Sequence, residues 1–142
     1  MKKEYGAKEV YNLYVFDERT DEPLFEIETS VKYGFGLHGD AGYFTFKSCL
    51  VHVDLLNDMA NGRFTLRDLR LVAHSKIREV ETGKDSDATL VIHCARLHSI
   101  SVEGSNNEVA DTVLGFDFDI QDVADRPNFR FIVSEDNSFS KK

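Results

Sequence analysis

The chain has 142 residues and a formal net charge of −8, from 17 lysines and arginines against 25 aspartates and glutamates. This excess of negative charge disfavours tight binding to nucleic acid, which needs clustered basic side chains on the phosphates. No apolar segment approaches the roughly 18 residues of a membrane-spanning helix, and the basic N-terminus lacks the apolar stretch of a signal peptide. We therefore expect a single domain, residues 1–142, that is made in a cytoplasm and does not enter a membrane.

The chain begins with a hairpin pattern. Glu9 to Asp17 (EVYNLYVFD) is rich in residues that favour strands. Glu18 to Glu22 (ERTDE) is a polar turn, and Leu24 to Ser30 (LFEIETS) then alternates apolar and acidic residues. This order of strand, short polar turn and alternating strand is typical of an antiparallel β-hairpin.

A glycine-rich segment follows, from Tyr33 to Gly42 (YGFGLHGDAG). It lacks the Lys-Ser/Thr pair of a phosphate-binding loop, and its glycine spacing does not match a dinucleotide-binding fingerprint. Because four glycines in ten residues carry a large ordering cost, we expect a long loop that is poorly ordered in an isolated subunit. We expect this loop to become ordered where two subunits meet.

The middle of the chain mixes two periodicities. Tyr43 to Lys47 (YFTFK) predicts a strand. Leu50 to Met59 fits a strand at its start and a helical face at its end, with a helix-stop signal at Asn61-Gly62. We expect a strand that runs into a short helix. Phe64 to Val72 returns to the strand pattern, with a bulge expected at Arg67-Asp68.

The second half of the chain carries the strongest pattern. Ala88 to Glu103 and Thr112 to Asp122 alternate apolar and polar residues, and a polar turn at Gly104 to Asn107 separates them. This pattern predicts a long antiparallel hairpin with one buried face. The core residues expected on that face are Leu90, Ile92, Ile100, Val102, Leu114, Phe116 and Phe118.

These patterns together define the expected fold class. Phe129 to Val133 (FRFIV) predicts a last short strand, and the polar residues 134–142 are expected to form a flexible tail. We expect an all-β fold with at most one short helix, an antiparallel β-sandwich or barrel with one long C-terminal hairpin. A hairpin of this length needs a second sheet, a closed barrel or a neighbouring subunit to cover its apolar face.

The cysteines and histidines do not form a convincing metal site. Cys49 and Cys94 lie in apolar strand contexts, which favours two reduced and buried thiols. His93 adjoins Cys94, and His52 follows Cys49 by three residues, but neither pair has the spacing of a zinc motif. Alternation along a strand also points His93 and Cys94 to opposite faces.

Catalytic residues are not evident either. The pairs His38/Asp40 and His52/Asp54 have the i, i+2 spacing that is more typical of a solvated strand face. No nucleophile stands beside a base, and no carboxylate pair stands out. We therefore predict a non-enzymatic protein with no catalytic, cofactor-binding or metal-binding residues.

Two segments carry motifs that point to a family. Asn12 to Ser30 combines a short strand, an acidic turn and a strand that ends near an acidic residue and a threonine. Ala88 to Ile120 carries a Ser-x-Ser-x-x-Gly turn at Ser99 to Gly104, followed by alternating apolar residues from Val113 to Ile120. The first segment resembles the opening hairpin of structural proteins from tailed-bacteriophage virions. The second resembles the end of phage tail-tube proteins and of the haemolysin-coregulated tube protein of type VI secretion.

The resemblance implies a self-assembling structural protein. Tube subunits of this family form rings, usually hexameric, whose inner wall is a continuous β-barrel around a channel. The partners would be further copies of the chain and other virion proteins, and the location would be the virion after synthesis in the bacterial host cytoplasm. An acidic wall would let DNA slide past, because like charges repel.

Two other classes of function stay open. The first is a small β-barrel binding module, of phage or bacterial origin, that recognises a ligand or a partner protein; a large apolar pocket within one subunit would favour it. The second is an enzyme, for which the chain offers no clear constellation of reactive groups.

Overall fold

The computed structural model describes residues 5–28, 32–48, 50–104 and 111–134. Within these ranges the fold is all-β, as the sequence predicts, with eight strands and one short helix. The elements are β1 (Tyr5–Asp17), β2 (Pro23–Ile27), β3 (Lys32–His38), β4 (Ala41–Ser48), α1 (Val53–Ala60), β5 (Leu69–Glu79), β6 (Asp85–Glu103), β7 (Asp111–Asp119) and β8 (Phe129–Ser134). The expected flexible tail lies, except for Ser134, outside the described residues.

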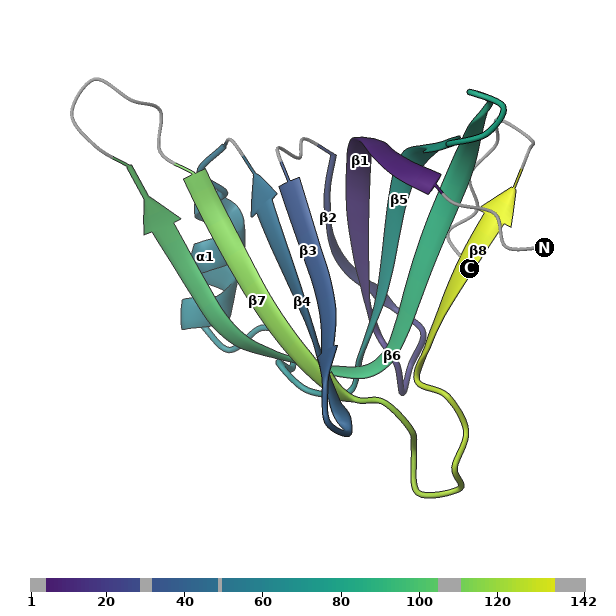
Figure 1. The fold of residues 1–142 in the computed structure, drawn as a ribbon. Coiled ribbons are helices and arrows are strands. Elements are labelled where there is room, and N and C mark those ends of the chain that lie inside the picture. Colours follow the sequence, from purple (N-terminus) through teal and green to yellow (C-terminus); the bar gives the residue numbers. More distant parts are fainter. Residues whose placement is uncertain (1–4, 29–31, 49, 105–110, 135–142) are drawn as a thin grey trace.

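The strands form one continuous antiparallel sheet that folds over at β6 into two layers, as Figure 1 shows. The first layer has the order β2-β1-β5-β6-β8, and the second has the order β6-β7-β4-β3. Asp85 to Ala95 in β6 pairs with β5, and Asp87 to Ile92 also pairs with β8. Arg96 to Glu103 pairs with β7. One strand therefore belongs to both layers.

The fold between the layers lies at Cys94. This residue has a φ of 55°, in the left-handed region that non-glycine residues seldom adopt. The backbone N–H of His93 donates a hydrogen bond of 2.6 Å to the carbonyl of Asn128, and that of Leu97 donates one of 2.8 Å to the carbonyl of Leu66. The prediction that Cys94 is buried is wrong, because its side chain is exposed at the bend.

The bend limits the predicted C-terminal hairpin to the second part of β6. β6 and β7 pair only from Arg96 to Glu103 against Asp111 to Asp117. The earlier part of β6 pairs instead with β5 and β8, which lie in the other layer. The alternating pattern correctly predicts a strand, but alternation does not show where a long strand changes partners.

The core lies between the two layers. β4 and β7 contribute Phe44, Phe46, Leu114, Phe116 and Phe118, and all five are fully buried. They pack with buried residues of the first layer, which are Leu13, Val15, Leu71, Leu90 and Ile92. Five of the seven predicted core residues are thus confirmed as buried.

Two predicted core residues are more exposed than expected. Ile100 is partly buried and packs against the core, whereas Val102 is 45% exposed. Both lie in the second part of β6, where the layers diverge toward the end of the strand (Figure 1). The prediction for Val102 is wrong, because an inward position buries a side chain only where the opposite layer covers it.

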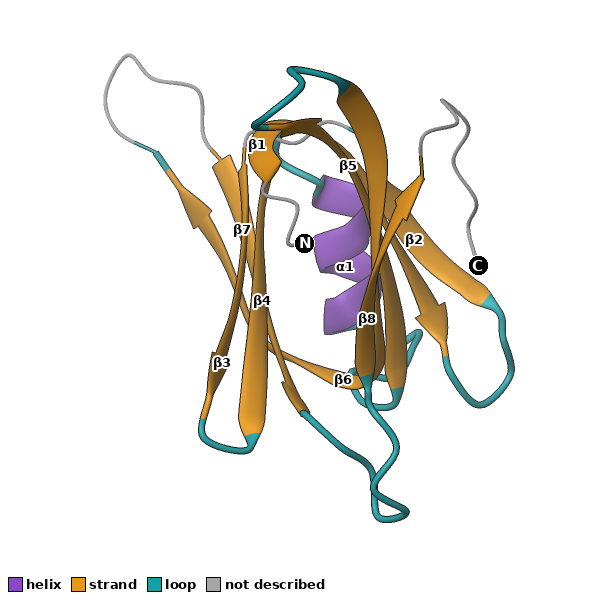
Figure 2. Cartoon of the chain, turned by 45° about the vertical axis from the view of Figure 1, so that its right-hand side comes forward, coloured by secondary structure: helices purple, strands orange, loops and turns teal. Residues whose placement is uncertain are grey.

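Helix α1 occupies the opening between the layers (Figure 2). It buries Leu55, and Met59 packs against the core. The helix ends before Gly62, which has a φ of +63°, so the predicted stop signal is confirmed. The expected strand over residues 51–53 is absent among the described residues, and β5 begins only at Leu69 rather than at Phe64. Residues 64–68 form turns and bends, with Asp68 at a φ of 53°.

The glycine-rich segment is not the predicted loop. Its first part forms β3, which pairs with β4 across a tight turn that includes Gly39 at a φ of +65°. Gly36 and Gly42 make room for aromatic rings: a Cβ would lie 2.3 Å from the Tyr43 ring at Gly36, and 2.2 Å from the Phe118 ring at Gly42. The glycines therefore serve close packing within a sheet, and their alternation with Tyr33, Phe35 and Leu37 is a strand pattern.

A cluster of aromatic rings joins the free ends of the two layers. Phe35 of β3 lies 5.2 Å from Phe129 and 6.0 Å from Phe131 of β8, measured between ring centroids. The Phe35 ring also stacks on Phe118 of β7 at 6.0 Å. Because β3 and β8 belong to opposite layers, these contacts hold the layers together without shared backbone hydrogen bonds among the described residues.

We predict that Phe116→Ala lowers the free energy of unfolding by about 3–5 kcal/mol, because it removes a fully buried ring and leaves a cavity. Urea unfolding measures this change. Val123→Ala is the control, since Val123 is fully exposed, and should change stability by less than about 0.5 kcal/mol. A loss below about 1 kcal/mol for Phe116→Ala would contradict the described core.

We also predict that Gly42→Ala destabilises the protein by about 1–3 kcal/mol, because the new methyl group meets the buried Phe118 ring. Gly36→Ala is the matched control in the neighbouring strand. There the methyl group meets the end of Tyr43, which is 47% exposed and free to turn toward solvent. Equal losses in the two variants, measured by urea unfolding, would show that Phe118 does not confine Gly42.

Candidate functional site

The outward side of the second layer is polar and poor in large side chains. Alternation along β4 and β7 points their buried phenylalanines inward, so the residues between them point outward. We call this surface the polar face. Its members are Gly34, Gly36, His38, Ala41, Tyr43, Thr45, Lys47, Arg96, His98, Ser99, Ser101, Glu103, Asp111, Val113, Gly115, Asp117 and Asp119.

The positive charges of the polar face are paired with carboxylates. Lys47 Nζ lies 3.3 Å from Asp111 Oδ2. Arg96 Nε donates a hydrogen bond of 2.6 Å to Asp117 Oδ1, and Arg96 also lies 3.8 Å from Asp119. Among the side chains described on this face, each lysine and arginine thus faces an acid. A phosphate would have to displace these carboxylates to bind here.

The polar face is also smooth. The Tyr43 ring lies over Gly36, where any side chain would collide with it. Ser99 lies equally close to Gly115, where an added Cβ would be 2.3 Å from its hydroxyl oxygen. Glycine at these positions keeps the surface flat, because neighbouring side chains lie against the backbone instead of projecting from it.

Both edges of the second layer are open in the described part of the chain. β3 pairs on one side only, with β4. From Arg96 onward, β6 pairs on one side with β7. On its other side, the backbone contact within the described residues is the hydrogen bond from the N–H of Leu97 to the carbonyl of Leu66. Each edge carries an exposed apolar side chain: Leu37 on β3 is 47% exposed and Val102 on β6 is 45% exposed. Open edges of this kind invite pairing with another chain.

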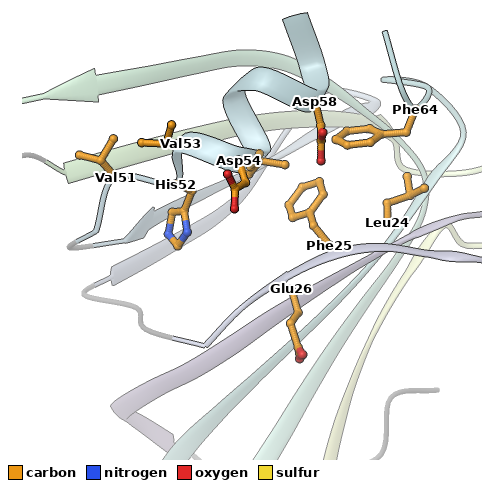
Figure 3. Close-up of a pocket in the computed structure, with 10 residues that line it drawn as sticks. Leu24, Phe25, Glu26, Val51, His52, Val53, Asp54, Asp58 and Phe64 are labelled. Atoms are coloured by element: carbon orange, nitrogen blue, oxygen red, sulfur yellow. The ribbon is translucent and has the colours of Figure 1, made fainter. Parts of the chain in front are cut away.

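A groove lies between the edge strand β2 and the helix α1 (Figure 3). Its volume is about 490 Å³, which is within the usual range for binding pockets. Figure 3 shows Asp58 pointing from α1 toward the rings of Phe25 and Phe64, and Asp54 pointing into the space between His52 and Phe25. The lining residues are Leu24, Phe25, Glu26, Val51, His52, Val53, Asp54, Leu55, Asp58 and Phe64.

The predicted histidine and cysteine neighbours serve structural contacts. His93 Nδ1 lies 2.6 Å from Glu18 Oε1, and Arg70 lies 3.5 Å from the other oxygen of Glu18. These contacts of Glu18 join β6 at its bend to the end of β1. The neighbouring Cys94 side chain is exposed. His52 Nε2 is 2.8 Å from the hydroxyl oxygen of Ser48, and burial lowers the pKa of His52.

The remaining candidate residues do not come together. His38 and Asp40 are both exposed at the turn between β3 and β4, and Cys49 lies outside the described residues. Within residues 5–28, 32–48, 50–104 and 111–134, there is no group of three or more histidine, cysteine or acidic side chains placed to hold a metal ion. The absence of a catalytic or cofactor site stays a prediction.

The chain matches no protein-family model, no curated protein sequence and no solved structure. Of the residues described, none belongs to a helix long and apolar enough to span a membrane. The functional argument therefore depends on the surfaces of this chain: the polar face, the two open edges beside it, and the groove.

The surroundings of Cys94 predict its reactivity. Partial burial of the sulfur, and then the carboxylates of Glu18, Asp68 and Asp122, raise the pKa of the Cys94 thiol. Because the thiolate is the reactive form, alkylation of Cys94 should reach its half-maximal rate at a higher pH in the folded chain than in urea. Iodoacetamide labelling with peptide mass spectrometry measures this at Cys94 separately from Cys49. A midpoint equal to that of the unfolded chain would contradict the prediction.

Proposed function

We propose that this chain is a non-enzymatic, self-assembling virion structural protein of the tail-tube type, whose subunits join into a ring around a DNA channel. The observation that carries this proposal is the pair of open edges on the second layer, each with an exposed apolar side chain, Leu37 and Val102. Exposed edges with apolar residues are a liability for a monomer. They become useful where a neighbouring copy covers them.

The strand directions support joining of the two edges. The three antiparallel pairings from β6 through β7 and β4 to β3 make β3 run opposite to β6. If β3 of one subunit lies beside β6 of the next, related by rotation about an axis along the strands, the new pair is again antiparallel. Such a head-to-tail contact uses two different surfaces and closes into a ring when the rotation permits. The second layers would then form one continuous barrel wall.

The polar face supports a channel-lining role in this arrangement. Lys47 and Arg96 are already paired with carboxylates, so DNA would find few free cations on the wall. The net charge of −8 adds repulsion at longer range. The family resemblance adds the expected hexameric ring, the contacts with other virion proteins, and the location in the virion after synthesis in the host cytoplasm.

A second candidate is a small β-barrel module that binds a ligand or a partner protein. The groove between β2 and α1 favours it, because this groove lies within one subunit and has aromatic rings on its wall. The two candidates differ in what the chain does alone: a ring protein associates with itself as its concentration rises, whereas a binding module stays monomeric.

We predict that the protein forms rings or tubes, and that Leu37→Lys and Val102→Lys each prevent this by placing an unpaired charge at a subunit contact. Size-exclusion chromatography with light scattering at rising concentration, followed by electron microscopy, measures the assembly. Val123→Lys is the control, because Val123 is a fully exposed valine in the loop before β8. A monomer at all concentrations, or equal assembly of the edge variants, would contradict the ring proposal.

A further inference from the structure

The groove between β2 and α1 presents the edge of a strand. Leu24, Phe25 and Glu26 are consecutive residues of β2, and all three line the groove. Successive side chains of a strand point to opposite faces of the sheet. A groove that is lined by three consecutive residues of β2 therefore runs along the edge of this strand. β2 pairs with β1 on its other side and is the last strand of the first layer. Its outer row of backbone N–H and C=O groups therefore faces the groove.

The groove offers apolar contacts beside this edge. The rings of Phe25 and Phe64 lie 5.7 Å apart at an interplanar angle of 36°, and both residues are only partly buried. A second hollow, of about 340 Å³, lies on the side of β2 toward β1 and is lined in part by Tyr14, Phe16 and Pro23. A strand added to the edge of β2 would point its alternate side chains toward these two hollows.

The charge of the groove is negative. Asp54 and Asp58 line it, and no lysine or arginine is among its described lining residues. Glu26 borders the groove, but its side chain points away from the two aspartates (Figure 3) and accepts a hydrogen bond from Tyr14 of β1. Arg63 reaches Asp58 at 3.5 Å, but both side chains are exposed, so this pair is weak in water. His52 does not compensate the charge at neutral pH, because burial lowers its pKa.

We propose that the groove binds an extended segment of a partner protein in which apolar and basic residues alternate, added as an antiparallel or parallel strand to β2. The open edge supplies backbone hydrogen bonds, the aromatic rings accept the apolar side chains, and the carboxylates of Asp54 and Asp58 select lysine or arginine. The same carboxylates disfavour nucleic acid and acidic peptides. The proposal does not depend on ring formation, because none of the described lining residues of the groove belongs to β3 or β6.

Binding can be tested with synthetic peptides on the full chain. The probe is the capped, fluorescently labelled peptide KVKVKVK, and fluorescence anisotropy measures its affinity whatever the assembly state of the protein. We expect binding that weakens at about 0.5 M NaCl, where charges are screened. The reversed-charge peptide EVEVEVE, and the peptide KVKPKVK with a proline that removes a backbone donor, should each bind at least about tenfold more weakly.

Protein variants test the charge of the site. The double variant Asp54→Asn and Asp58→Asn should weaken KVKVKVK binding at least about fivefold, because it removes the charge that selects lysine. The matched control neutralises two exposed acids elsewhere, Glu81→Gln and Asp125→Asn, and changes the net charge equally. Equal weakening in the two variants would overturn the proposal, because the attraction would then be that of the whole acidic protein.

Hydrogen exchange measured by mass spectrometry locates the bound peptide. We expect new protection of the backbone amides of β2 when KVKVKVK is bound. No binding, protection at β3 or β8 instead of β2, or equal affinity for EVEVEVE would overturn the proposal. It would also be overturned if the groove variant, without peptide, dissolved an assembly of the chain, because the groove would then bind a second copy. If Leu37→Lys and Val102→Lys leave assembly unchanged, the ring proposal is contradicted and the groove proposal is not.

Discussion

The structure depends on the bend in β6. This strand is 19 residues long and pairs with β5, β8 and β7, so it is the one strand shared by both layers. The left-handed conformation of Cys94 redirects the chain, and the hydrogen bond from His93 to Asn128 holds it there. The contact of His93 with Glu18 ties the bend to β1. A straight β6 would extend a single flat sheet, with no second layer to cover its apolar face.

The two layers stay together through aromatic packing. Phe44, Phe46, Phe116 and Phe118 fill the space between them, and Phe35 bridges to β8 where the layers have no common strand. The Phe118 ring lies against the backbone of Gly42, its partner in the neighbouring strand of the same layer, where a side chain would collide with it. Close packing of the rings therefore requires glycine, which has no side chain, at a few positions.

The distribution of charge separates the two candidate surfaces. The net charge of −8 belongs to the whole chain, but the fold places it unevenly. On the polar face, acids pair with Lys47 and Arg96. In the groove, Asp54 has no lysine or arginine beside it among the described lining residues. The first arrangement gives a surface to which phosphate has little to bind, and the second gives a surface that favours a cation.

The sequence by itself determined the all-β class, the short helix and most of the core. Alternation identified Leu90, Ile92, Leu114, Phe116 and Phe118 as buried, because a period of two is a local property of a strand with one covered face. Asn61-Gly62 marked the helix end for a similar reason, since a left-handed glycine stops a helix wherever it occurs.

Only the tertiary structure decided which strands pair and which surfaces stay open. The change of partners at Cys94 depends on contacts with Asn128 and Leu66, which are distant in sequence from the bend. The sequence predicts a loop for the glycine-rich segment, whereas the structure has a strand, because the rings that its glycines accommodate, such as Tyr43, lie in the neighbouring strand. The groove likewise joins residues of β2 to residues of α1. Pairing and burial between distant segments are properties of the folded chain, and the local periodicity of the sequence does not predict them.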